Sequence, residues 1–144
     1  MNSNSNTTSF ATLTGTYPAV LLASGTASNT DTLVTSGATN ASIVLDILFR
    51  NLDNSNNVNF DIIIGPTGSN TTEQNNRVQM SVPAASGNNG TTPLASLAGQ
   101  VPVLFDMDLA GNRVITLESG ISIYVRNKAA LSGDICITVK QRNF

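Results

Sequence analysis

Hydrophobic residues recur at every second position in four segments of the chain. These segments are residues 43–49, 58–64, 121–125 and 135–139. A period of two is that of a β-strand, whose successive side chains point to opposite faces of a sheet. We therefore expect one face of each strand in a core and the other partly wet. In the first segment the expected inward residues are Ile43, Leu45, Ile47 and Phe49.

Shorter apolar runs predict further strands, and no stretch has a convincing helical period. These strands are expected at residues 10–14, 17–23, 31–36, 77–82, 101–107 and 113–118. One helical turn at most is expected, at residues 93–97. Many short strands separated by turn residues are typical of an antiparallel β-sandwich or jelly roll. We therefore predict an all-β fold.

Gly, Pro and Asn mark the turns between these segments. The polar residues 52–57 separate the two strongest strands, and we interpret them as a hairpin loop. Gly120 separates the segments 113–118 and 121–127, which suggests a second, tight hairpin.

The length of 144 residues fits a single domain. Residues 1–9 read as a polar N-terminal arm, and residues 10–144 as the β-sandwich domain. Residues 65–100 are rich in Asn, Thr, Ser and Gly, so we expect a long loop there with one strand at 77–82. Long loops in compact domains are usually functional or disordered. The arm and the loop are therefore either surface chain or segments that order against neighbouring subunits.

The composition excludes several function classes. Charged residues are 11% of the chain, against about 25% in an average soluble protein. The chain has no His, which removes imidazole bases and ligands, and a single Cys, which excludes an intramolecular disulfide and a cysteine cluster for zinc. The net charge of −2 argues against a nucleic-acid partner. No secretory signal and no apolar run of membrane length is apparent, so we expect folding in a cytoplasm and no membrane partner.

Two acidic motifs are candidates for chemistry. Asp46 and Asp61 lie on the strands that flank residues 52–57 and would face each other across a hairpin, but we expect them to be exposed carboxylates on the wet face of a sheet. Residues 106–112 resemble the start of a calcium loop, with Asp106, Asp108 and Gly111 in place. The acid expected at the twelfth position is Leu117, so we interpret this segment as a turn.

The remaining polar residues predict no active site. Cys136 is expected on the strand face opposite Ile135, Ile137 and Val139, with nothing in sequence to mark an activated thiolate. The cations are scattered without interleaved aromatic residues, which argues further against nucleic acid. They are Arg50, Arg77, Arg113, Arg126, Lys128, Lys140 and Arg142. We therefore expect a protein that is not an enzyme, with no catalytic, cofactor-binding or metal-ligating residue and no cofactor.

The composition of the polar surface is the feature that indicates a function. With 18 Asn, 17 Thr and 15 Ser, the polar surface consists mostly of amides and hydroxyls. Such groups cost less to desolvate than charges, and the cores of protein interfaces are depleted of charges. The composition therefore favours a building block that contacts other subunits.

A resemblance agrees with this interpretation. The strand that ends at Arg50, the segment 58–65, the long loop, the segment 113–127 with its turn at Gly120, and the closing strand 133–141 resemble small β-sandwich virion proteins of tailed bacteriophages. Capsid decoration (cement) proteins are the nearest group. The resemblance spans residues 33–141. It rests on strand order and the general character of the sequence, and not on an invariant motif.

The resemblance implies a virion protein that assembles in the host cytoplasm and braces the capsid lattice. Its implied partners are the major capsid protein and further copies of itself, often as a homotrimer. The alternatives are a phage tail, baseplate or fibre component, a bacterial surface-appendage subunit, and a lectin-like calcium- or carbohydrate-binding module. The absence of Trp and the incomplete calcium loop count against the last of these.

Overall fold

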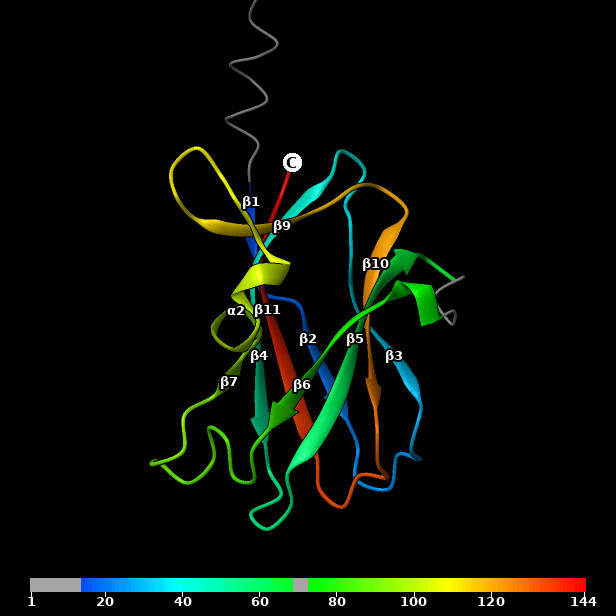
Figure 1. The fold of residues 1–144 in the computed structure, drawn as a ribbon, viewed down its shortest axis with the longest axis vertical. Coiled ribbons are helices and arrows are strands. Elements are labelled where there is room, and N and C mark those ends of the chain that lie inside the picture. Colours follow the sequence, from blue (N-terminus) through cyan, green and yellow to red (C-terminus); the bar gives the residue numbers. More distant parts are fainter. Residues whose placement is uncertain (1–13, 69–72) are drawn as a thin grey trace, which may run out of the picture.

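The computed structural model describes residues 14–68 and 73–144, and its architecture is all-β. The expected arm (residues 1–9), and all but the last residue of the strand expected at 10–14, lie outside the described residues. Two antiparallel sheets carry the fold (Figure 1). The larger contains β1 (Thr14–Thr16), β2 (Ala19–Leu22), β4 (Ser42–Asn51), β7 (Ala95–Ser96), β8 (Asp106–Met107), β9 (Arg113–Leu117) and β11 (Ile135–Asn143). The smaller contains β3 (Asp31–Ser36), β5 (Val58–Pro66), β6 (Asn76–Val82) and β10 (Ile121–Asn127).

The strand order is that of a jelly roll. Without the short strands β1, β7 and β8, the larger sheet runs β2-β11-β4-β9 and the smaller sheet β3-β10-β5-β6. The chain therefore changes sheets at most of its connections, as in a double-sheet jelly roll. The prediction of an antiparallel sandwich is confirmed.

Both expected hairpins are wrong, although the turns themselves are present. Residues 52–57 connect β4 of the larger sheet to β5 of the smaller sheet, so these two strands do not pair. Gly120 does adopt the left-handed conformation, with φ +84°, and the Ile121 N–H donates to the Glu118 carbonyl across the turn. That turn also crosses between sheets, from β9 to β10. Turn residues predict a reversal of the chain, but not which sheet the next strand joins.

The core lies between the two sheets. Phe49 of β4 and Phe60 of β5 are fully buried and bring their ring centroids to 5.4 Å across the sandwich. Apolar side chains of both sheets surround this pair and exclude water from it. Among them are Ile47, Ile62, Val82, Leu117, Ile123, Val125, Ile135, Ile137 and Val139.

A β-bulge in β4 reverses the orientation of its first half. Lys140 of β11 pairs with Asp46, but the next residue, Gln141, pairs with Val44, so Leu45 is an extra residue. Inserting one residue moves every side chain before it to the opposite face. Val44 is therefore fully buried, whereas Ile43 and Leu45, which we expected in the core, are partly exposed.

The outer face of the smaller sheet is less exposed than expected. Ile63 is fully buried, and Asp61 and Tyr124 are 4% and 9% exposed. The chain after β5 lies over part of this face: the Gly68 N–H donates to the Tyr124 hydroxyl, and Arg126 reaches Glu73 in the 3-10 turn Glu73–Asn75. The alternating pattern of β5 therefore does not separate a dry face from a wet one.

The expected long loop at 65–100 contains several short elements. They are the end of β5, the 3-10 turn, β6, β7 and the one-turn helix α2 (Leu97–Gln100). β6 falls at the strand expected at 77–82, and the helical turn lies just after the expected 93–97. The strand expected at 101–107 is wrong: residues Pro102–Leu104 form a 3-10 turn, and only Asp106–Met107 pair as β8. Among the described residues, no helix is long and apolar enough to cross a membrane.

Candidate functional site

The outer face of the larger sheet is broad and carries apolar side chains. Strand register places Cys136 between Leu21 and Arg50, and Thr138 between Ala19 and Leu48. Leu21 is 59% exposed, and Cys136, Leu48 and Thr138 are partly exposed. The bulge in β4 adds Ile43 and Leu45 to the same side. We call this surface the larger-sheet face.

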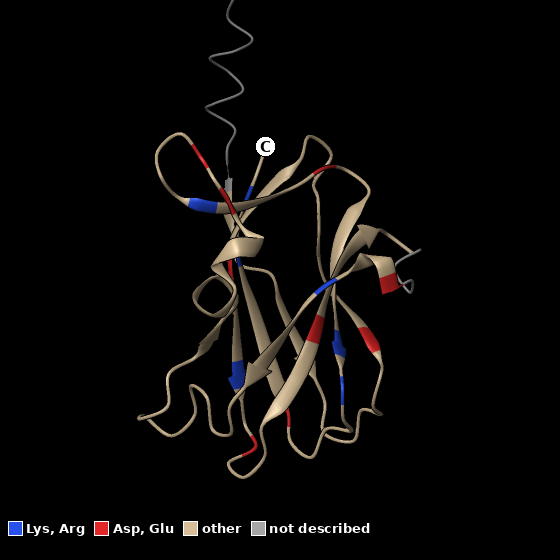
Figure 2. Cartoon of the chain, viewed as in Figure 1, with Lys and Arg blue, Asp and Glu red and all other residues tan. Residues whose placement is uncertain are grey.

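Three of the seven cations in the sequence lie on the larger-sheet face. Lys140 and Arg142 are exposed and form no ion pair within the described part of the chain. Arg50 is exposed as well, and its Nη2 donates to Oδ1 of Asn88 at 3.0 Å. Figure 2 shows how thinly charges are spread over the molecule. The larger-sheet face therefore combines exposed aliphatic groups with neutral polar ones and a few free cations.

Asp46 and Asp61 do not form a pair. They lie on different sheets, each on the outer side, so the expected juxtaposition across a hairpin is wrong. Asp46 accepts hydrogen bonds from the Ser96 hydroxyl at 2.6 Å and from the Ala98 and Ile47 N–H groups at 3.0 and 2.8 Å. Its carboxylate therefore anchors β7 and α2 to β4.

Asp61 is buried, which also corrects the expectation of an exposed carboxylate. Its Oδ2 lies 3.0 Å from Nζ of Lys128, and the register places Asp61 opposite Arg126. Buried carboxylates are normally neutralised by a cation in this way. We interpret Asp61 as part of the structural charge network of the smaller sheet.

Arg126 is the centre of that network. Its Nε donates to Asp31 at 2.6 Å and its Nη1 to Glu73 at 2.8 Å. The hydrogen bond from Arg126 lowers the pKa of Glu73, and the hydrogen bond to Asp31 raises the pKa of Arg126. These contacts join β10, β3 and the 3-10 turn, so the role of Arg126 is to stabilise the fold.

The calcium-like segment is a self-contained turn. The Asp108 carboxylate accepts the N–H groups of Ala110 and Asn112 at 2.9 and 2.7 Å, and the Asn112 amide at 3.2 Å. The Asn112 N–H contributes most to lowering the pKa of Asp108. Because N–H groups of the same loop already donate to this carboxylate, the geometry of residues 106–112 supports their interpretation as a turn.

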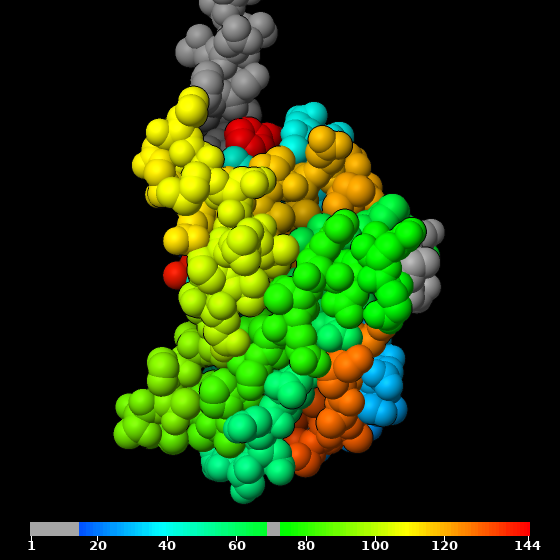
Figure 3. All heavy atoms as spheres, in the orientation of Figure 1, coloured from blue at the N-terminus to red at the C-terminus, as the bar shows by residue number. Residues whose placement is uncertain are grey.

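The same loop carries exposed hydrophobic residues. We call residues 102–112 the 102–112 loop; it projects from one end of the sandwich, drawn in yellow in Figure 3. Val103, Met107 and Leu109 are 88%, 62% and 110% exposed. Met107 and Leu109 alternate with Asp106 and Asp108 in sequence, and this alternation is the signal that would have indicated them.

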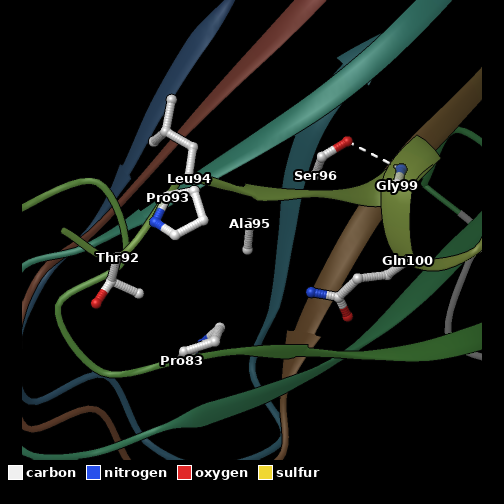
Figure 4. Close-up of a pocket in the computed structure, with 8 residues that line it drawn as sticks. All are labelled: Pro83, Thr92, Pro93, Leu94, Ala95, Ser96, Gly99 and Gln100. Atoms are coloured by element: carbon white, nitrogen blue, oxygen red, sulfur yellow. Dashed lines mark hydrogen bonds between the residues drawn. The ribbon is translucent and has the colours of Figure 1, made fainter.

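An apolar pocket lies between the end of β6 and the segment that contains β7 and α2 (Figure 4). Its volume is about 270 Å³. None of the lining residues is charged, and nothing in the sequence pattern indicated the pocket. They are Pro83, Thr92, Pro93, Leu94, Ala95, Ser96, Gly99 and Gln100.

At the end of the sandwich opposite the 102–112 loop, polar side chains connect the loops by hydrogen bonds (Figure 1). Asn51 is fully buried: its Nδ2 donates to the carbonyls of Asn56 and Pro83, and its Oδ1 accepts from the Asp53 N–H. The Asp53 carboxylate accepts hydrogen bonds from the Ser132 hydroxyl, the Asn56 amide and the Ser55 N–H. The Ser132 bond is the largest of the causes that lower the pKa of Asp53. Part of the Asn content thus serves the fold.

Cys136 lies where the sequence predicted, on the outer side of β11. It is a free thiol, partly exposed, between strands β2 and β4. Its register partners are Leu21 and Arg50. The thiol is thus one of the small apolar groups of the larger-sheet face.

No protein-family model matches this chain, and a comparison with curated protein sequences gives no match. Among solved structures, the chain is similar to one described as the cyanophage Pam1 capsid asymmetric unit. The TM-score is 0.46 and the sequence identity 15%, over 92% of this chain and 86% of that one. A likeness of this degree assigns no function.

Proposed function

We propose that this chain is a non-enzymatic structural protein of a bacteriophage virion, and specifically a capsid cement protein. In this role it binds the outside of an assembled shell as one or more copies and braces the lattice of the major capsid protein. The single observation that carries the proposal is the larger-sheet face, a broad sheet surface that exposes aliphatic and neutral polar groups together with three cations.

The chemistry of that face suits burial against another protein. Leu21 and Leu48 supply apolar area, and Thr138 supplies a hydroxyl that can be desolvated at low cost. Each large aliphatic side chain that becomes fully buried contributes about 1.5–3 kcal/mol. Many small contributions of this kind, repeated over every copy on a lattice, support stabilisation of the whole shell.

The acidic residues support a structural role in the same way. Asp46, Asp61 and Asp108 each have a partner that belongs to the fold, as described above. The resemblance to cement proteins, drawn from strand order, adds the expectation that the site of action is the capsid.

The proposal is tested by particle stability. A cement protein binds the assembled lattice and not the free capsid subunit, so it stabilises the shell by mass action. Phage particles stripped of this protein should release their DNA at a lower temperature, and adding the protein back should restore the original release temperature. The variant Leu21→Asp should fail to restore it, whereas Leu33→Asp, a matched change at an exposed leucine of β3 on the other sheet, should succeed.

Three results would count against the proposal. Equal release temperatures with and without the protein would remove the cement role. Microscopy that places the protein on the tail would favour a tail, baseplate or fibre component instead. Absence of the protein from purified particles would remove the virion role altogether.

A further inference from the structure

The 102–112 loop presents a leucine that the fold itself does not cover. Leu109 is fully exposed at the tip, and the hydrogen bonds from Ala110 and Asn112 to Asp108 hold the turn on either side of it. At the base of the loop, Nη1 of Arg113 donates to the Pro102 carbonyl at 3.1 Å. Because the turn is fixed by its own hydrogen bonds, presenting Leu109 to a partner requires little additional ordering.

The pocket beside β7 has the complementary character. It is lined by Pro93, Leu94 and Ala95 without a charged side chain, and its volume of about 270 Å³ exceeds that of a leucine side chain. Apolar area of this kind favours an aliphatic occupant. No described residue of the same chain fills the pocket, so it is open to a side chain of another molecule.

Charge complementarity selects a second copy of this chain as that molecule. The exposed Asp106 lies near Leu109 and forms no ion pair within the described residues. The exposed Arg50 lies beside Leu94: a Cβ on Gly87 would lie 2.5 Å from Cδ2 of Leu94 and 3.4 Å from Cγ of Arg50. An acidic loop with an apolar tip thus matches an apolar pocket with a cation at its rim.

We propose that this protein self-associates head to tail, with Leu109 of one copy seated in the pocket of the next and Asp106 facing Arg50. Since the loop and the pocket are different surfaces, the contact is heterologous, and repetition gives a ring or a chain of copies. The proposal does not rest on the capsid role, because both surfaces belong to this chain. It uses the loop, the pocket and Arg50 at one end of the larger-sheet face, and leaves Leu21, Leu48 and Thr138 of that face free.

The area of the contact is small, so we expect the self-association to be weak. Stable protein pairs bury roughly 800 Å² on each partner, more than a single loop in a pocket supplies. Purified protein should therefore be monomeric at low micromolar concentration and associate toward millimolar concentration. Copies held side by side on a surface would associate far more completely, because their effective concentration is raised.

The test is sedimentation velocity on the purified full chain over that concentration range. Leu109→Ser and Leu94→Ser should each weaken association by at least roughly tenfold, since a buried leucine contributes more than the 1.4 kcal/mol that corresponds to this factor. Leu33→Ser is the matched control: it changes an exposed leucine of β3, outside the contact and outside the larger-sheet face, and should leave association unchanged. Circular dichroism and thermal midpoints establish that each variant is folded.

A mixing experiment tests the head-to-tail geometry. Asp106→Arg and Arg50→Glu should each associate more weakly than the wild type, because each places like charges together. Mixed in equal amounts, they should associate again, because the cationic loop of the first variant then meets the anionic pocket rim of the second. The proposal is wrong if the wild type stays monomeric up to millimolar concentration, if Leu109→Ser associates as well as the wild type, or if the mixture is no stronger than its components.

Discussion

Single asparagine and aspartate side chains fix the loops of this molecule. Asn51 and Asn127 are fully buried at the ends of their strands and donate to loop carbonyls, Asn127 to those of Ala27 and Ala129 at 2.8 Å. The composition indicated that amides would dominate the polar groups, but we assigned them to the surface. A buried amide and an exposed one have the same sequence pattern, so only the structure separates the two uses.

The Asp53 carboxylate gives a residue-scale prediction about pH. Its pKa is lowered from 3.8 by hydrogen bonds from Ser132, Asn56 and Ser55. A lowered folded-state pKa contributes stability that is fully present above 3.8 and is lost as the pH falls from there through the folded-state pKa. Asp53→Asn should therefore unfold at a lower temperature than the wild type at neutral pH, and the difference should shrink in strong acid.

Thermal unfolding of both proteins from neutral to strongly acidic pH measures this difference. Glu118→Gln is the control, because the Glu118 side chain is exposed and makes no hydrogen bond with the described residues. A difference between Asp53→Asn and the wild type that is constant over the whole range would contradict the assignment.

Phe60 gives the corresponding prediction for the core. It is fully buried against Phe49, so Phe60→Ala removes a large side chain from between the sheets. The free energy of unfolding should fall by about 3–5 kcal/mol, as for other large-to-small changes in cores. Urea titration measures the change. Leu33→Ala, at a position 45% exposed, should change the free energy by less than about 0.5 kcal/mol. Equal losses in the two variants would argue against the core described here.

At the scale of elements, the alternation of residues predicted strands well and their partners poorly. The strands at 58–64, 121–125 and 135–139 follow the pattern: their inward residues are buried, except Ile64 and Ile121, which are partly buried against the core. The segment 43–49 is a strand too, but the bulge at Leu45 reverses its first half, and the local sequence carries no glycine or proline to mark it. The bulge is also what moves Ile43 and Leu45 to the larger-sheet face, so a surface important for the proposed function was hidden from sequence.

The edge of the smaller sheet gives an element-scale prediction. Among the described strands β6 pairs only with β5, and an open edge invites pairing with another chain. The Gln100 side chain covers part of this edge: its Nε2 donates to the Ser81 carbonyl at 2.7 Å, and its Oε1 accepts from the Ser81 N–H at 3.2 Å. Gln100→Ala frees both groups and should accelerate aggregation, with a loss of stability of only about 1 kcal/mol.

Light scattering at a temperature well below unfolding measures the aggregation rate. Gln79→Ala removes an equal amide from β6 itself, where the side chain makes no hydrogen bond with the described residues. If Gln79→Ala aggregates as fast as Gln100→Ala, the loss of an exposed amide, and not the uncovered edge, is responsible.

At the scale of the whole molecule, the fold class followed from the sequence, but the topology did not. Both connections interpreted as hairpins, residues 52–57 and the turn at Gly120, carry the chain from one sheet to the other. Their turn chemistry is the same in either case, because the difference arises from packing of the two sheets. The pocket and the 102–112 loop are formed by different segments, and no local pattern could have related them.

Low charge makes a prediction about the whole particle. Exposed ion pairs are screened as the Debye length falls from about 10 Å at 0.1 M salt to about 3 Å at 1 M, whereas aliphatic and neutral polar contacts are not. If the larger-sheet face binds the capsid mainly through residues such as Leu21 and Thr138, the protein should stay on particles through a several-fold rise in ionic strength. Sedimentation of particles at increasing salt, followed by quantification of the bound protein, measures this.

The free cations of the same face provide the matched control. Removing both in Lys140→Gln/Arg142→Gln should leave most of the binding intact, while Leu21→Asp should abolish it, because a carboxylate would then be buried without a partner. The opposite pattern, with salt releasing the wild type and the double variant failing to bind, would mean that Lys140 and Arg142 hold the protein on the particle. The argument that aliphatic and neutral polar contacts dominate the binding would then be wrong, although the location on the capsid would stand.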